Sequence, residues 1–188
     1  MTDTSHGAAC SQLITCYLYS GHATSQLIDG TPAGKEAWEL ARAHYEKASS
    51  LTVFHYANMH PDRVASLAGL ADLELRQGRL TDAQEHLAEA LRLGRLVYGH
   101  SHAQTAALLV QTTRLNRLLG KHDEAIVDLT NALEQTRTTL DSTFESISER
   151  QQLLMTAAMR EALDEYLTLV IGGHGDVDRL YAEVLAWK

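Results

Sequence analysis

The sequence predicts an all-α fold in which antiparallel helix hairpins stack as a short right-handed superhelix of about five to eight helices. Alanine and leucine dominate the composition, and only two of the 188 residues are proline. That leaves little room for the turn-dense pattern of a β-sandwich or barrel. Apolar residues also recur at helical spacing, and the chain resembles itself at an offset of 42 residues. Together these observations favour a helical repeat.

The net charge of −8 limits the ligands that we expect. Nucleic acid needs a concentrated field of Lys and Arg, so it is not expected as the main partner. No apolar run approaches the ~20 residues of a membrane span, and residues 1–20 lack the basic and apolar regions of a secretory leader. Cys10 and Cys16 do not make a disulfide framework in a chain of this size. The sequence therefore predicts a cytoplasmic protein without membrane contact.

The 42-residue offset keeps small residues on small ones and large residues on large ones. The matched pairs are His60 and His102, Ala65 and Ala107, Leu67 and Leu109, Gly78 and Gly120, Ala83 and Ala125, Leu87 and Leu129, Ala90 and Ala132, and Leu91 and Leu133. One unit upstream, Ala41 and Ala48 continue the series, with Tyr45 at the position of Leu87. Each unit is therefore one supersecondary element that stacks on its neighbours.

Within one unit the pattern predicts a helix hairpin. Residues 62–77 carry an apolar helical face, and Gly78 ends that helix because it tolerates the left-handed backbone conformation. Thr81 with Gln84 fits a capping box that starts the second helix, and Ser101 with Gln104 repeats this spacing in the next unit.

These residues resemble the tetratricopeptide repeat (TPR), in particular the 42-residue type of kinesin light chains. The segments that carry the resemblance are Gly78-Arg79-Leu80-Thr81-Asp82-Ala83, Gly120-Lys121-His122-Asp123-Glu124-Ala125 and the joint Tyr98-Gly99-His100-Ser101-His102. Two positions depart from the family, since Glu74 and Asn116 stand where an aromatic residue is usual four residues before the turn glycine. Thr112 and Thr113 also replace the usual Leu-Gly or Leu-Ala pair. These departures predict that the second unit packs less tightly or is covered by another segment.

The resemblance divides the chain into five segments. We expect an N-terminal helical segment or degenerate repeat at 1–34, whose continuity Gly21 puts in question, and the second helix of the first repeat at 35–59. Two repeats follow at 60–101 and 102–145, and capping or connector helices at 146–188. Terminal repeats are commonly atypical because one face meets water.

The last segment predicts a long helix that opens at a capping box of Ser146 and Glu149, then a glycine hinge at 172–175 and a final helix. The expected core stripe of the long helix is Leu153, Leu154, Ala157, Ala158, Leu163, Tyr166, Leu167 and Val170. Residues 148–152, 163–167 and 181–188 are similar to the connector that precedes the caspase-like CHAT domain in bacterial TPR–CHAT proteins.

No motif predicts catalysis, and we expect a protein that is not an enzyme and has no cofactor. His100 and His102 offer only two potential metal ligands, which indicates a role in lining and capping the linker instead of a metal site. Cys10 and Cys16 show no sequence feature that would activate a thiolate, and they are most simply interpreted as helix-packing residues. Gly-rich phosphate loops and nucleophile elbows are missing from the sequence.

The resemblance instead implies a concave groove that binds a protein or peptide. Its groove positions, carried over by counting back from Gly78 and Gly120, include Asp72, Leu75, Arg76, Val110, Arg114, Arg117 and Leu118. The three arginines suit carboxylates. The alternatives are that they are ordinary exposed residues that pair with Glu and Asp, and that the C-terminal helices fold back into the groove.

The predicted function is protein–protein interaction. The specific form is the regulatory or target-sensing region of a larger protein with a CHAT protease-like domain. A free-standing scaffold or chaperone-like adaptor and a helical oligomerisation module are the alternatives.

Overall fold

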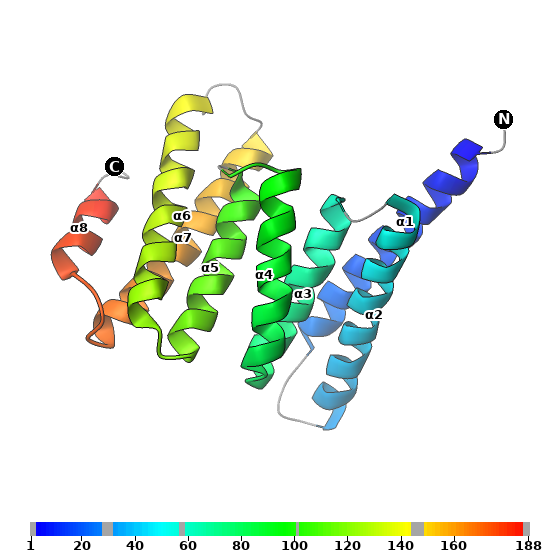
Figure 1. Cartoon of the computed structure of the whole chain (residues 1–188), viewed down its shortest axis with the longest axis horizontal. Coiled ribbons are helices and arrows are strands. Elements are labelled where there is room, and N and C mark those ends of the chain that lie inside the picture. Colours follow the sequence, from blue (N-terminus) through cyan, green and yellow to red (C-terminus); the bar gives the residue numbers. More distant parts are fainter. Residues whose placement is uncertain (1–2, 28–31, 57–58, 101, 144–148, 186–188) are drawn as a thin grey trace. The chain divides into compact units, whose positions relative to one another are not determined.

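The computed structural model describes residues 3–27, 32–56, 59–100, 102–143 and 149–185, which contain eight helices (Figure 1). They fall into two compact units, Met1–Val97 and Tyr98–Lys188. The first unit contains α1 (Asp3–Ser25), α2 (Pro32–Tyr56), α3 (Pro61–Gln77) and α4 (Leu80–Val97). The second contains α5 (Ala103–Leu118), α6 (His122–Thr143), α7 (Glu149–Ile171) and α8 (Val177–Leu185). The prediction of an all-α hairpin fold is confirmed.

The first unit is organised around the aromatic ring of Tyr45 on α2. A Cβ atom added to Gly21 on α1 would lie 3.0 Å from this ring, and one added to Gly69 on α3 would lie 2.4 Å from it. Both glycines therefore let a helix backbone approach the ring closely. Helix α1 also runs through Gly21 without interruption. Trp38, Ala41, Leu70 and Leu73 complete this buried cluster.

The second unit buries a core formed by α5, α6 and α7. Its buried members are Val110, Ala125, Leu129, Leu133, Met159, Ala162, Tyr166 and Leu169. The stripe predicted for α7 is wrong in part, since Leu153 is 65% exposed and Leu167 is 46% exposed. Leucines lie on more than one face of this helix, and its contact with both α5 and α6 decides which face is buried. The side chains of Leu154 and Ala158 lie outside the described residues.

The same hydrogen-bonded turn ends the first helix of both central hairpins. The Gly78 N–H donates to the carbonyl of Leu75 (3.1 Å), and the Arg79 N–H donates to that of Glu74 (2.9 Å). Gly120 repeats this pattern 42 residues later, with a φ of 74° against 72° at Gly78. This paired motif requires a left-handed residue, so the turn predicted from glycine is confirmed at both positions.

Histidines start the first helix of each central hairpin. The Nδ1 of His60 accepts a hydrogen bond from the Asp62 N–H (3.2 Å), and the Nδ1 of His102 accepts one from the Gln104 N–H (3.1 Å). Each imidazole also stacks on a tyrosine ring four residues earlier in the chain, Tyr56 and Tyr98 respectively. The capping role predicted for His102 at this linker is confirmed, and the helix that it caps is α5.

The capping boxes were predicted less well. Ala83 donates its N–H to the carbonyl of Arg79 (3.1 Å), so α4 begins at Leu80 and Thr81 lies inside its first turn. At α5 the capping side chain is His102. Ser101 and Ser146 lie outside the described residues.

Candidate protein-binding surface

The predicted groove residues of the first unit form a local polar cluster on α3. The Nε of Arg76 lies 2.9 Å from a carboxylate oxygen of Asp72 one turn earlier. A terminal nitrogen of Arg76 also donates to the Ser25 carbonyl at the end of α1 (3.3 Å). Leu75 is buried in the core. The face of α3 that the sequence predicted for binding thus exposes Arg76 and Asp72 as a charge pair.

In the second unit, the predicted groove residues separate into three environments. Val110 is buried and belongs to the core, whereas Leu118 at the end of α5 is exposed. Arg114 and Arg117 lie one turn apart on α5 and are each about a third exposed, with side-chain exposures of 31% and 29%. The two arginines therefore remain in contact with solvent while facing a neighbouring helix.

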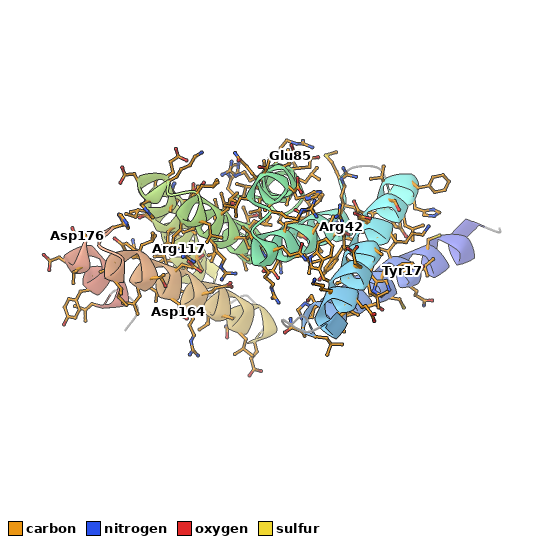
Figure 2. All side chains as sticks on the ribbon, turned by 90° about the horizontal axis from the view of Figure 1, so that it is seen from below. Tyr17, Arg42, Glu85, Arg117, Asp164 and Asp176 are labelled. Carbon is orange, nitrogen blue, oxygen red and sulfur yellow. The ribbon has the colours of Figure 1, made fainter. Side chains whose placement is uncertain are left out.

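A single carboxylate on α7 joins these two arginines. The Nε of Arg114 donates to Oε1 of Glu165 (2.9 Å), and the Nε of Arg117 donates to Oε2 of the same residue (3.2 Å). Figure 2 shows Arg117 next to α7, the helix that also carries Asp164. The Glu165 side chain is only 10% exposed. Charge-assisted hydrogen bonds to both oxygens are what a nearly buried carboxylate requires.

A second, weaker acidic contact lies at the solvent side of the same cluster. Glu161, one turn before Glu165, accepts a hydrogen bond from a terminal nitrogen of Arg114 at 3.3 Å. Its side chain is 49% exposed. We call Arg114, Arg117, Glu161 and Glu165 the arginine cluster. It contains one well-shielded carboxylate and one that solvent reaches easily.

The sequence analysis left open that the arginines pair with Glu or that the C-terminal helices cover them, but it did not identify Glu161 and Glu165, because it treated residues 146–170 as a connector. Their spacing of four residues places both on one helix face, which was the only local signal. Polar pairs between the two helices of each hairpin explain why Glu74 and Asn116 replace the usual aromatic residue. Glu74 pairs with His86 (2.7 Å), and Asn116 donates to Asp128 (3.0 Å). In both hairpins these partners are 12 residues apart, so a polar pair joins the two helices at the equivalent position.

The described residues contain no candidate metal site. Among them, no group of three or more His, Cys, Asp and Glu side chains is placed to hold a metal ion. Both cysteines are free thiols. Within the same residues, no helix is long and apolar enough to span a membrane.

Comparison with known proteins agrees with this architecture. Residues 62–138 match the family model of the tetratricopeptide repeat. The search of curated proteins gives no significant match. The fold is similar to the crystal structure of BtubC (BKLC) from P. vanneervenii, with a TM-score of 0.67 and 16% sequence identity. That similarity covers 95% of this chain and 65% of the BtubC chain. The chain thus has a TPR-like helical-repeat fold, in which residues 62–138 carry the segment that the tetratricopeptide family model recognises.

Proposed function

We propose that this chain is a protein-interaction module that binds an acidic segment of its partner at the arginine cluster. The supporting observation is the unequal pair of carboxylates on α7. Two arginines of α5 hold Glu165 with both of its oxygens, and Arg114 also reaches the exposed Glu161. A carboxylate of the partner would take the position of Glu161, while Glu165 stays in place.

The energetics favour this exchange. An exposed ion pair such as Arg114–Glu161 contributes roughly 0–1 kcal/mol, so its replacement costs little. The nearly buried Glu165 is different, because removal of a shielded partner leaves uncompensated charge. Helix α7 is further held by Met159, Ala162, Tyr166 and Leu169 in the core. The partner would therefore add to the surface of α5 and α7 without displacing α7.

In the first unit, the predicted groove residues Asp72 and Arg76 on α3 would form a polar binding surface of their own. Arg76 is 44% exposed and is held by Asp72 and the Ser25 carbonyl. It therefore presents a positioned cation without a large loss of side-chain entropy on binding.

The test uses a partner captured by the wild-type chain, identified by mass spectrometry and then purified. Glu161→Gln should strengthen its binding by roughly two- to fivefold, because a competing exposed carboxylate is removed. Arg114→Gln should weaken it by roughly tenfold or more, because Arg114 is the residue that holds Glu161 and would hold the partner's carboxylate in its place. Arg95→Gln on α4 makes the same change at another exposed arginine and serves as the control.

Isothermal titration calorimetry at two salt concentrations would measure these affinities. An affinity that Glu161→Gln and Arg114→Gln leave within twofold of wild type would refute the arginine cluster as the binding site. A circular dichroism spectrum equal to that of the wild type would show that each variant is folded.

A second proposal concerns the context of the module, which we infer to be regulation of a CHAT protease-like domain. It is supported by the resemblance of residues 148–152, 163–167 and 181–188 to the TPR–CHAT connector. On α8 the exposed apolar residues Val177, Tyr181 and Leu185 lie four residues apart along one face, which suits contact with a further domain. The coding sequence after Lys188 tests this idea, since a stop codon there would leave the adaptor function. Light scattering would distinguish the CHAT-regulatory and adaptor functions from self-association through α8, because only self-association requires a dimer or larger oligomer.

A further inference from the structure

A thiol and an imidazole meet between α1 and α2 in the first unit. The Sγ of Cys10 lies 3.2 Å from the Nε2 of His55, although the residues are 45 positions apart in the chain. Cys10 is partly buried and His55 is exposed at the end of α2. The edge of the neighbouring Phe54 ring packs against the imidazole, with 4.8 Å between the ring centroids and 84° between the planes.

This arrangement has the two parts that thiol chemistry requires. The nucleophile of a cysteine is its thiolate, and an adjacent imidazole within hydrogen-bond distance can accept the thiol proton. Cys16 lies six residues further along α1 and is exposed. It provides a comparison thiol on the same helix, because the structure places no hydrogen-bonded base beside it in the described part of the chain.

The position of Cys16 also decides which reaction is available. Six residues of helix separate the two Cα atoms by about 9 Å along the axis, and a disulfide cannot bridge Cα atoms more than about 7 Å apart. An intramolecular disulfide between Cys10 and Cys16 is therefore excluded while α1 stays helical. Oxidised Cys10 needs a sulfur atom from another molecule.

We propose that Cys10 is a site of reversible modification by small-molecule disulfides, with His55 as the base that activates it. The Cys10 thiol passes its proton to His55 Nε2, and the thiolate attacks one sulfur of the incoming disulfide. The S–S bond of that molecule breaks, a mixed disulfide forms on Cys10, and the second sulfur leaves as a thiolate. The Cys10 sulfur is oxidised, the leaving sulfur is reduced, and His55 returns its proton to water.

The expected rate follows from the thiolate population. A free cysteine is only a few per cent thiolate at pH 7, so complete proton transfer would raise the reactive fraction by up to about 30-fold. The thiolate of an activated cysteine is also a weaker nucleophile, so the gain in rate is only about the square root of the gain in thiolate fraction. Cys10 should therefore react faster than Cys16, by up to about fivefold. Exposure alone predicts the opposite order, because Cys16 is the more exposed thiol.

The probe is 4,4′-dithiodipyridine, a neutral disulfide whose release of 4-thiopyridone is followed by absorbance on the full chain. Cys10→Ser and Cys16→Ser assign the two phases to their thiols. His55→Gln should slow the Cys10 phase to about the rate of Cys16, whereas His22→Gln, at an exposed histidine of α1, should leave it unchanged.

Equal rates of Cys10 and Cys16 at pH 7, or a Cys10 rate that His55→Gln leaves unchanged, would overturn the proposal. Both thiol rates are measured without the binding partner, so neither result bears on the proposed function.

Discussion

Replacing Gly69 by alanine tests the close packing of α1, α2 and α3 around Tyr45. In an open helix interior this change stabilises a protein by about 0.8–1.0 kcal/mol, because alanine has the higher helix propensity. At Gly69 the new Cβ would lie 2.4 Å from Cζ and 2.5 Å from Cε1 of Tyr45. Favourable carbon–carbon contacts lie at about 3.5–4.0 Å, so either the ring or a helix must move by about 1 Å.

The size of the effect follows from two opposing contributions. Overpacking a closely packed core costs about 1–3 kcal/mol, which exceeds the gain in helix propensity at most sites. We therefore expect Gly69→Ala to lower the free energy of unfolding by up to about 2 kcal/mol. Gly21→Ala faces the same ring at 3.0 Å, where a small shift is enough, and should be closer to neutral.

The assay is urea unfolding of wild type, Gly69→Ala, Tyr45→Leu and the double variant, followed by circular dichroism. Tyr45→Leu removes the ring atoms that the new Cβ would meet, so in that background Gly69→Ala should become neutral or stabilising. The double-mutant cycle then isolates the contact between the two positions. If Gly69→Ala stabilises the wild type as it would an open helix, the ring does not lie where the structure places it and the reasoning fails.

The remaining predictions concern pH and the arginine cluster. Burial lowers the pKa of His102 below its usual value of 6.5, and protonation would also remove the acceptor that caps α5. The contribution of neutral His102 to the free energy of unfolding should thus be complete above about pH 6.5 and lost as the pH falls through the lowered pKa. His102→Asn keeps a side-chain acceptor for the helix cap. Urea unfolding measured at several pH values should therefore show a smaller loss of stability at low pH in this variant. Glu165→Gln should destabilise the chain by about 1–3 kcal/mol, because two partly shielded guanidinium groups lose their carboxylate. Glu161→Gln changes an exposed neighbour on the same helix and should cost under about 1 kcal/mol in the same thermal or urea unfolding; equal effects of the two variants would contradict the structure.

Local sequence was enough to predict the helices and the turns of the central hairpins. Helical periodicity depends on residues three and four apart, and the left-handed turn depends on a single glycine. Gly78 and Gly120 could therefore be assigned without a structure, and so could the apolar face of α3. The 42-residue repeat adds that the two hairpins share one design.

The contacts of the candidate sites were decided by tertiary structure. Arg114 and Glu165 are 51 residues apart, and Cys10 and His55 are 45 apart. No periodic pattern links such positions. The face of α7 that is buried was also unpredictable from the sequence, because this helix carries leucines on more than one side and two neighbouring helices select among them. The sequence by itself thus determined which segments are helices and where the hairpins turn, since those depend on neighbours along the chain. Only the packing of separate helices decided which charges and thiols meet, because their partners come from distant segments.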